Sequence, residues 1–331
     1  MGDIAPTVSV ILPTYNRADV LERAVKIVTD QTWRPLQLVL VNDGSSDDTQ
    51  SVMAALEAKV REARVEPTFI NKPNGGCASA RNLAMQHVTG DYFAFLDDDD
   101  LWYPEKLAKQ VAELQRTGAD GCCCQVVRLS EGGAKRRLMP PDAAMLMRGR
   151  EPGKFIDRRA DAHLITIVLR TSKRGEVGEF NTTMRTWSDT EWIIRALHVA
   201  DFCAVGEVLG EYVFNDKSLS RFEGFEELFK RDGYQDLALK LIKDNNKQRD
   251  NWDEAAWRRR VSQDYDEFIK HRLYAGDLDG ARKCYEEAVS LAGDASLFAR
   301  TRRKMRKAWW LSLIGKKLQH PKFGAGEMIR G

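Results

Sequence analysis

Short apolar runs alternate with amphipathic stretches along the first hundred residues. Runs that are nearly uninterrupted by polar residues, as in strands buried on both faces, occur at 8–12, 36–41, 69–70 and 92–96. The stretches between and after them carry apolar residues at helical spacing, at 18–31, 48–59, 78–87 and 104–116. This alternation predicts an α/β fold with a Rossmann-like, mostly parallel sheet and helices on both of its faces.

The pattern changes further along the chain. We expect a strand at 163–169, a helix at 188–200 and a strand pair at 202–214 around Gly206, whereas 132–153 shows no clear period and is interpreted as a mobile insertion. After about Phe222 only helical patterns remain. The sequence therefore predicts two domains, an α/β domain at 1–221 and a helical C-terminal domain at 222–331.

Composition narrows the class of protein. The 331 residues are 43% hydrophobic and 30% charged, which suits a globular protein and argues against both disorder and a membrane bundle. The net charge of +2 gives no reason to expect a nucleic-acid partner. Neither a secretory leader nor a run of about 18 apolar residues is visible. We therefore expect a cytoplasmic protein, with peripheral attachment at the inner face of the cell membrane left open.

Six cysteines are present, and Cys122, Cys123 and Cys124 are consecutive. Neighbouring side chains in a strand point to alternate faces, so these three cannot form a zinc clamp. We interpret them as small buried hydrophobic side chains in a reducing compartment.

Polar residues of unusual type follow three of the predicted strands. These segments are Pro13–Arg17, Asp43–Ser45 and Asp97–Asp100. Ligands of open parallel sheets lie beyond the carboxyl ends of the strands, so the three segments should converge on one cleft.

The four consecutive aspartates, 97–100, are the most informative of these segments. Adjacent carboxylates repel one another unless a cation neutralises them, and oxygen ligands suit Mg²⁺ or Mn²⁺. A solvated acidic loop is the alternative, but this cluster directly follows a wholly apolar strand at a predicted ligand edge. Gly75-Gly76 before a helix fits either an anion site or a plain turn. The chain has no GxGxxG after the first strand, no P-loop and no GxSxG, which argues against dehydrogenases, P-loop NTPases and serine hydrolases.

Four motifs together match a known family. They are the segments 8–17 (VSVILPTYNR), 41–47 (VNDGSSD), 74–82 (NGGCASARN) and 90–100 (GDYFAFLDDDD). In order and spacing, the chain from residue 7 to about 104 resembles family 2 glycosyltransferases of the GT-A fold, and weaker similarity extends to about Ser220.

The resemblance implies an inverting transfer of a sugar from a nucleotide-sugar, most often a UDP-sugar, to a hydroxyl acceptor. It implies that the donor nucleotide contacts Pro13, Thr14, Tyr15, Arg17, Asp43, Gly75, Arg81, Asp97 and Asp98. Asp97 to Asp99 would be the DxD element, with Asp99 as the direct ligand of Mn²⁺ or Mg²⁺ and Asp100 as a structural neighbour.

Inversion needs a general base that takes the proton of the acceptor hydroxyl. The family commonly supplies the Asp of a Glu-Asp pair at a helix start, and Asp189 matches it, although Ser188 replaces the usual Glu. Glu191 is the alternative base, and a plain helix cap is the alternative role of Asp189. Lys217 or Arg221 would contact the diphosphate in a closing loop, or would belong to an ordinary solvated loop.

The segment 300–317 combines eight Lys and Arg residues with Trp309 and Trp310. It suits either a helix on an anionic membrane surface or a terminal helix that buries its tryptophans. If this helix contacts a membrane, we expect the acceptor to be a glycan or a lipid-linked glycan, as in the synthesis of polysaccharide, lipopolysaccharide or another cell-envelope glycan. The alternatives to a glycosyltransferase are a catalytically degenerate scaffold of the same fold and a sugar nucleotidyltransferase.

Overall fold

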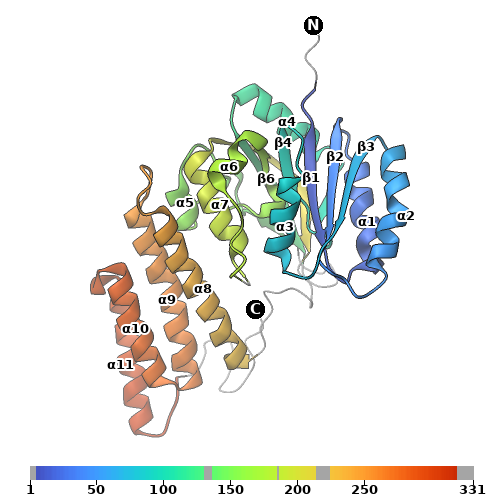
Figure 1. Cartoon of the computed structure of the whole chain (residues 1–331). Coiled ribbons are helices and arrows are strands. Elements are labelled where there is room, and N and C mark those ends of the chain that lie inside the picture. Colours follow the sequence, from blue (N-terminus) through green and yellow to red (C-terminus); the bar gives the residue numbers. More distant parts are fainter. Residues whose placement is uncertain (1–4, 130–135, 185, 214–223, 319–331) are drawn as a thin grey trace. The chain divides into compact units, whose positions relative to one another are not determined.

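The computed structural model describes residues 5–129, 136–184, 186–213 and 224–318 (Figure 1). The chain divides into two compact units, one formed by 1–155 with 159–216 and the other by 156–158 with 217–331. The boundary that the sequence places between residues 221 and 222 falls within 214–223, outside the described residues, and stays a prediction.

One nine-stranded sheet forms the centre of the first unit. Its strands are β1 (Val8–Thr14), β2 (Leu36–Asn42), β3 (Val65–Asn71), β4 (Tyr92–Phe95), β5 (Leu101–Trp102), β6 (Gly121–Leu129), β7 (Arg136–Met139), β8 (Val168–Arg170) and β9 (Phe202–Val213). They lie in the order β3-β2-β1-β4-β8-β6-β9-β5, and β7 pairs with β6. The first four strands are parallel, as is β9 beside β6, while β8, β7 and β5 run antiparallel to their neighbours.

Helices cover both faces of this sheet, as predicted (Figure 1). They are α1 (Ala18–Thr29), α2 (Thr49–Glu62), α3 (Cys77–Gln86), α4 (Lys106–Thr117), α5 (Pro152–Ile156), α6 (Arg174–Val177) and α7 (Ser188–Val199). The apolar stripes of α1, α2 and α4 pack on the strand residues that point to one face, such as Val8, Val10 and Leu12. Alternate strand residues such as Ile11 are equally buried on the other face, where α3 packs against β1 and β2.

The predicted strand at 163–169 is wrong over its first half. Leu164–Thr166 forms a turn of 3-10 helix, and only the end of the run contributes to β8. Thr166 closes the turn, because both its N–H and its hydroxyl donate to the carbonyl oxygen of His163, at 2.9 and 2.7 Å. The apolar side chains of this turn are buried, as they would be in a strand, so the hydrophobic pattern could not distinguish a 3-10 turn from a strand.

Two further expectations need correction. The predicted strand pair at 202–214 is the single strand β9, whose register against β6 jumps so that Cys124 faces Val205 and Gln125 faces Val208. Gly206 therefore lies in a bulge rather than in a hairpin turn. The predicted irregular insertion, as far as residues 136–153 are described, holds β7, the 3-10 turn Ala143–Met145 and the start of α5.

The second unit is helical over its described residues, as predicted after Phe222. Its helices are α8 (Gly224–Asn246), α9 (Glu254–Ala275), α10 (Leu278–Ala292) and α11 (Ala299–Leu313). The short segment 156–158 belongs to this unit because Asp157 pairs with Arg259 at 2.7 Å and Arg158 pairs with Asp264 at 2.7 Å. No helix in the described ranges is both long enough and apolar enough to span a bilayer.

Candidate active site

Three parallel strands end level with one another, which brings their following loops together. Thr14 at the end of β1 pairs with Asn42 of β2, and Asn42 pairs with Asn71 of β3. Beyond β4, the N–H of Leu96 donates to the carbonyl oxygen of Ile11 at 2.9 Å. The loops at the ends of β1, β2 and β4 therefore meet at one edge, as the sequence predicted.

Asp43 ties the loop after β2 to the start of α3. One carboxylate oxygen accepts hydrogen bonds from Lys72 at 2.5 Å and from the N–H of Gly75 at 3.0 Å, and the other accepts from the N–H of Gly76 at 2.7 Å. The side chain is only 4% exposed. Asp43 thus shapes the glycine-bearing loop, and any contact with a nucleotide would come in addition to that task.

Asn16 links the loops after β1 and β2. Its backbone N–H donates to the Ser45 hydroxyl, and its side-chain oxygen accepts from the N–H of Ser46, both at 2.8 Å. Next to it, Tyr15 is 48% exposed, so its ring is free to stack on a planar ligand at this edge.

The side chains of Asp97 and Asp98 point to different partners. Asp97 pairs with Arg81 of α3 at 2.6 Å. Asp98 accepts a hydrogen bond from the Thr14 hydroxyl at 2.7 Å and lies 3.8 Å from Arg17. Burial raises the pKa of Asp98 to about 6, against the lowering effects of the Thr14 hydrogen bond and the Arg17 charge.

Asp99 and Asp100 also differ from each other. Asp99 lies 3.4 Å from Arg17 and keeps a side-chain exposure of 24%. Asp100 is buried and accepts a hydrogen bond from the N–H of Val213 in β9 at 2.9 Å. Burial, and then the charges of Asp97 and Asp99, raise the pKa of Asp100 well above its ordinary value. This placement is that of a structural neighbour, as the resemblance implied.

Arg81 and Asn82 join α3 to the chain that leads into α7. Asn82 exchanges two hydrogen bonds with the backbone of Phe180, at 2.7 and 2.9 Å. The guanidinium of Arg81 lies over the Phe180 ring, 5.6 Å from its centre. Burial lowers the pKa of Arg81, but the charge and hydrogen bond of Asp97, together with the charges of Cys77 and Asp189, outweigh this effect, so the pKa is raised.

A cluster of aromatic rings fixes α7 beside the end of β4. The Trp192 ring stacks on Phe180 with centroids 5.0 Å apart and meets Phe95 edge-to-face at 5.3 Å. The indole N–H donates to the carbonyl oxygen of Gly178 at 2.9 Å. These contacts position the first turn of α7 near the aspartates.

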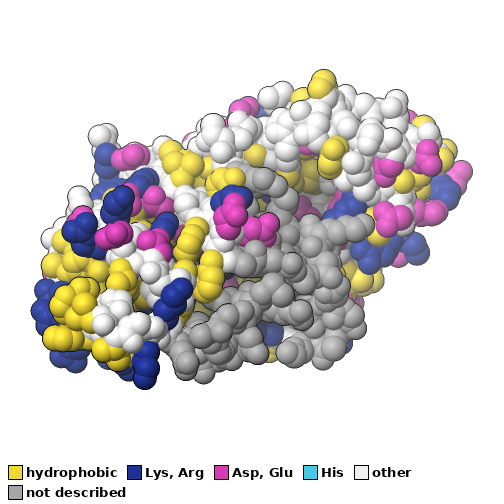
Figure 2. Space-filling view, turned by 90° about the horizontal axis from the view of Figure 1, so that it is seen from below, with side chains coloured by type: hydrophobic (Ala, Val, Ile, Leu, Met, Phe, Trp, Pro, Cys, Tyr) yellow, Lys and Arg dark blue, Asp and Glu magenta, His cyan; other side chains and the backbone are white. Residues whose placement is uncertain are grey.

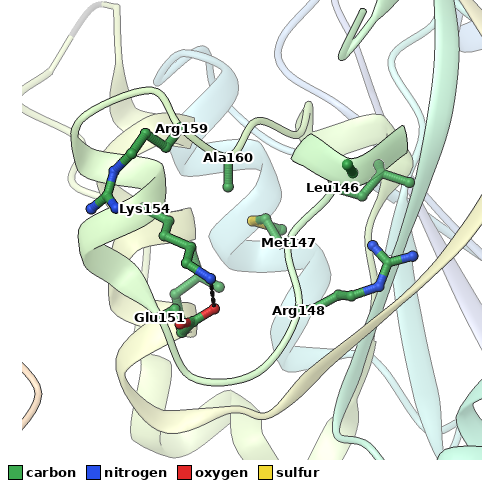
Figure 3. Close-up of a pocket in the computed structure, with 9 residues that line it drawn as sticks. Leu146, Met147, Arg148, Glu151, Lys154, Arg159 and Ala160 are labelled. Carbon is green, nitrogen blue, oxygen red and sulfur yellow. Dashed lines mark hydrogen bonds and ion pairs between the residues drawn. The ribbon is translucent and has the colours of Figure 1, made fainter. Parts of the chain in front are cut away.

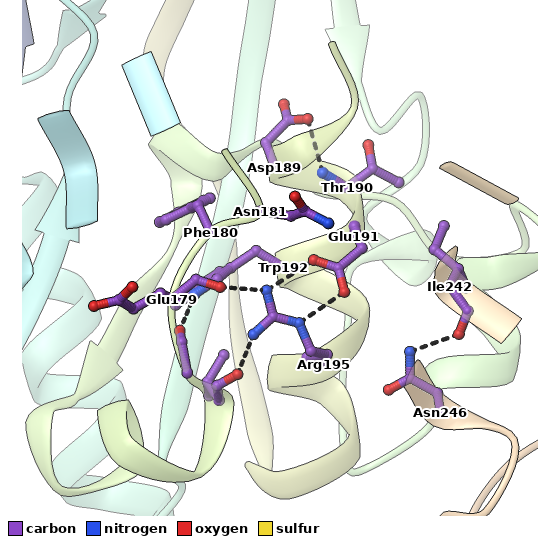
Figure 4. A network of polar contacts seen from close by, with 12 residues as sticks. Glu179, Phe180, Asn181, Asp189, Thr190, Glu191, Trp192, Arg195, Ile242 and Asn246 are labelled. Atoms are coloured by element: carbon purple, nitrogen blue, oxygen red, sulfur yellow. Dashed lines mark hydrogen bonds and ion pairs between the residues drawn. The ribbon is translucent and has the colours of Figure 1, made fainter. Parts of the chain in front are cut away.

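Two acidic residues in that first turn have opposite environments (Figure 4). Glu191 is fully buried, and Arg195 holds both of its oxygens, at 2.8 and 2.7 Å. Arg195 also donates to the carbonyl oxygen of Glu179 at 2.7 Å. Asp189 points away from this pair and accepts a hydrogen bond from the N–H of Thr190 at 2.7 Å. Glu191 is therefore engaged in structure, whereas Asp189 is accessible for chemistry.

Sequence reasoning missed one aromatic side chain at the same edge. Burial raises the pKa of Tyr212 in β9 to about 12, and the charges of Asp100, Asp97 and Asp189 act in the same direction. Asp189 therefore lies within electrostatic reach of the aspartate run. The Tyr212 ring also packs on His163, with centroids 4.7 Å apart. No local signal marks Tyr212, because long-range strand pairing brings it here.

Lys72 was missed as well, although a lysine just before a glycine-bearing loop could have drawn attention to it. Lys217 and Arg221, proposed for a closing loop, lie outside the described residues.

A separate hollow of about 100 Å³ lies elsewhere in the first unit (Figure 3). Three basic side chains, Arg148, Lys154 and Arg159, line it, and Glu151 pairs with Lys154 at 2.6 Å. Ligand pockets for molecules of nucleotide-sugar size are about 300–1,000 Å³, so this hollow is too small for the donor.

The donor set at the strand-end edge fits a divalent ion that is shared with a ligand. Mg²⁺-type ions commonly take one or two carboxylates and complete their shell with phosphate and water oxygens. Asp97 and Asp99 keep side-chain exposures of 30% and 24%, so both are within reach of such an ion. In the part of the chain that is described, no group of three or more acidic, His or Cys side chains forms a metal cage.

This arrangement of strand ends, aspartates and α7 agrees with the comparisons with known proteins. The family model described as Glycosyl transferase family 2 matches residues 9–194, and the chain belongs to this family. An uncharacterized glycosyltransferase of Rickettsia felis is 29% identical over 199 residues, which are 59% of this chain and 32% of the relative. The chain thus spans about a third of the length of that relative. The putative teichuronic acid biosynthesis glycosyltransferase TuaG of Bacillus subtilis is 41% identical over 111 residues, 34% of this chain and 43% of TuaG.

Solved structures support the fold. Residues 1–349 of S. aureus TarS in complex with UDP-GlcNAc align with a TM-score of 0.62 at 15% identity, covering 98% of this chain and 96% of that one. The mannosyltransferase PcManGT from Pyrobaculum calidifontis, in complex with GDP-Man and Mn²⁺, gives 0.52 at 17% identity and covers 95% and 89%. The predicted GT-A fold with a helical C-terminal region is thereby confirmed.

Proposed function

We propose that the chain is an inverting glycosyltransferase that moves a sugar from a nucleotide-sugar to a hydroxyl acceptor. The observation that carries this proposal is that Asp97 to Asp99, the loop held by Asp43, and the first turn of α7 with Asp189 lie at one edge of the sheet. A site that stabilises the diphosphate leaving group and an accessible carboxylate that deprotonates the acceptor are two parts that such a transfer would use.

In this account the strand-end loops bind the donor. The exposed ring of Tyr15 stacks on the base, beside Pro13 and Thr14. Gly75 lets the donor approach the backbone at the start of α3, although its N–H already binds Asp43. Asp99, with Asp97 beside it, would hold Mn²⁺ or Mg²⁺, which when bound neutralises charge on the diphosphate leaving group. Arg17, which lies close to Asp98 and Asp99, adds positive charge near the proposed diphosphate site.

Asp189 acts on the acceptor. Its carboxylate takes the proton of the acceptor hydroxyl while that oxygen forms a bond to the anomeric carbon. The bond from this carbon to the diphosphate oxygen breaks on the opposite face, and the nucleoside diphosphate leaves with the electron pair. Glu191, the alternative base, is unsuited because its oxygens are buried against Arg195.

The relatives suggest the substrate classes. TuaG is named for teichuronic acid biosynthesis, and TarS and PcManGT were solved with UDP-GlcNAc and GDP-Man. We propose a cell-envelope glycan, lipid-linked or free, as the acceptor, and a UDP-sugar as the donor on the basis of the family resemblance.

Hydrolysis of candidate donors tests the chemistry without knowledge of the acceptor. The full chain is incubated with Mn²⁺ and UDP-glucose, UDP-GlcNAc or GDP-mannose, and the sugar first released is assigned by proton NMR. An α-linked donor should give β-sugar, and Asp189→Asn should slow its release about 100-fold or more. Asp142→Asn, an exposed helix-cap aspartate, is the matched control. Release of α-sugar, or an unchanged rate in Asp189→Asn, would contradict the proposal, and nucleotide binding without turnover would favour the degenerate scaffold.

A further inference from the structure

The last turn of α11 presents an exposed apolar surface. Eight large hydrophobic side chains are exposed in the described residues, and four of them occupy positions 309–314. These four, which we name the tryptophan patch, are Trp309, Trp310, Leu313 and Ile314, with exposures of 52%, 64%, 59% and 66%. Figure 2 shows hydrophobic side chains gathered among Lys and Arg side chains on the C-terminal helices. Such a cluster is uncommon on a soluble surface and indicates an interaction site.

The patch belongs to the outward face of its helix. The opposite face, with Met305 and Ala308, packs on a cluster that includes Ile269 and Leu273 of α9 and Ala281 of α10. The inward face of α11 is therefore buried within its own unit, and the tryptophans contribute nothing to this packing. The expectation that the terminal helix buries them is wrong for this unit.

Positive charge flanks the patch on both sides. On the outward face before it are Arg302, Arg303, Arg306 and Lys307, and after it come Lys316 and Lys317. Helical spacing of three and four residues places Arg306 in line with Trp309 and Trp310. The sequence has no Asp or Glu from 295 to 318, and within the described ranges none of these six cations has an ion pair with a carboxylate. Among the described residues, their charge is thus not neutralised.

We propose that the outward face of α11 docks on an anionic lipid surface. Tryptophan prefers the headgroup region of a bilayer, where its ring is buried and its N–H stays hydrated. Leu313 and Ile314 would enter the acyl boundary, and the flanking cations would contact the lipid phosphates. No helix in the described chain suits a bilayer crossing, so this contact would be peripheral. It would bring the active site to acceptors carried by the membrane.

Vesicle flotation of the full chain tests this proposal. We expect flotation with phosphatidylcholine vesicles that contain about 30 mol% phosphatidylglycerol, little flotation with pure phosphatidylcholine, and weaker binding as salt rises. Trp309→Ser with Trp310→Ser should reduce the bound fraction about tenfold. The matched control is Leu237→Ser, an exposed leucine of α8, which should bind like the wild type.

Charge is tested separately by Arg306→Glu with Lys307→Glu, against Arg282→Glu with Lys283→Glu on α10. Only the α11 pair should lose binding, although both change the net charge equally. The tryptophans are exposed, so melting temperature and nucleotide binding should not change, which separates this proposal from the enzymatic one. Equal binding to neutral and anionic vesicles, or wild-type binding by the tryptophan variant, would overturn it. Loss of self-association in that variant without any vesicle binding would instead identify a protein interface.

Discussion

At the residue scale, Asp189 and Glu191 show how neighbouring carboxylates acquire separate roles. Both lie in the first turn of α7, yet Glu191 is sealed in an ion pair with Arg195 and Asp189 is not. Arg195 in turn holds the chain before α7 through the carbonyl oxygen of Glu179. The ion pair therefore positions the residue that we propose as the base.

We predict opposite effects for two substitutions in this turn. Glu191→Gln leaves the buried guanidinium of Arg195 without its countercharge and should lower the free energy of unfolding by about 3 kcal/mol. Asp189→Asn should leave stability within about 0.5 kcal/mol and remove donor turnover. Urea denaturation and the donor assay measure the two quantities. Equal stability losses in both variants would show that Asp189 is structural as well.

Cys77 offers a natural reporter of the donor site. It is an exposed free cysteine that opens α3, one turn before Arg81, whereas Cys122, Cys123, Cys124 and Cys203 are buried. Burial of its sulfur atom raises the pKa of Cys77 to about 12, so alkylation is slow and is followed at alkaline pH. Bound nucleotide should slow alkylation of Cys77 by about tenfold and leave that of the half-buried Cys284 unchanged. Mass spectrometry after timed exposure to N-ethylmaleimide gives both rates. Unaltered labelling of Cys77 at saturating nucleotide would place the ligand elsewhere.

The site residues at strand ends were predictable because each follows an apolar run in the sequence. Tyr212 was not, since its position depends on the pairing of β9 across the sheet. The burial of Cys122, Cys123 and Cys124 was predicted correctly, because neighbouring side chains in a strand point to alternate faces and cannot form a metal clamp. The local sequence pattern thus identifies the site residues at the strand ends, whereas a residue that long-range strand pairing brings to the site cannot be found in this way.

At the element scale, the loops after β2 and β3 approach so closely that a side chain is excluded. A Cβ atom on Gly44 would lie 2.5 Å from the backbone nitrogen of Asn74, and the φ angle of Gly44 is +73°. Gly44→Ala should therefore separate these loops and weaken nucleotide binding about tenfold or more. Gly118→Ala shares the left-handed strain, at φ +74°, but meets no atom within 4 Å. Calorimetric titration of both variants should show the loss in the first alone, and equal affinities would contradict the role of this loop.

The first turn of α4 carries a buried lysine, and the burial of its positive charge lowers the stability of the fold. Lys106 lies 3.9 Å from the centre of the Trp102 ring, and its amine has no hydrogen-bond partner among the described residues. Burial lowers the pKa of Lys106 to about 8 from an ordinary 10.5.

Between these two pH values the unfolded chain holds the proton that the folded chain has lost, so this group makes stability rise with pH. Lys106→Met should stabilise the protein at pH 7 by about 3 kcal/mol, since one pKa unit corresponds to about 1.4 kcal/mol, and should flatten the pH dependence of stability between pH 8 and 10.5. Chemical denaturation of both proteins across this range provides the difference. A variant that is less stable at pH 7 would show that the cation–π contact outweighs burial.

Elements with a strong local pattern were predicted almost to their ends, as α1 and β2 illustrate. The errors at 163–169 and 202–214 arose where Thr166 closes a turn and where Gly206 permits a bulge. Both local conformations depend on hydrogen bonds to distant or irregular backbone. The spacing of hydrophobic residues in the sequence does not reveal such hydrogen bonds.

At the scale of the whole molecule, one unit carries the residues that we propose for catalysis, and the other carries the surface that we propose for membrane docking. Every proposed donor and base residue belongs to the first unit, over which the family match extends. The second unit contributes the tryptophan patch and its flanking cations. We therefore expect mutations to separate sugar transfer from membrane binding.

The central claim is that the edge of the sheet where β1, β2 and β4 end binds a nucleoside diphosphate together with a divalent metal ion. Thermal unfolding of the full chain with UDP, GDP, CMP or dTDP, each with and without Mn²⁺, tests it most directly, because a ligand specific to the native state raises stability. We predict that one nucleoside diphosphate, expected to be UDP, raises the melting temperature by about 5 °C only with Mn²⁺, and that Asp99→Ala loses this shift while Asp142→Ala keeps it. No shift with any nucleotide, or a full shift in Asp99→Ala, would contradict the account.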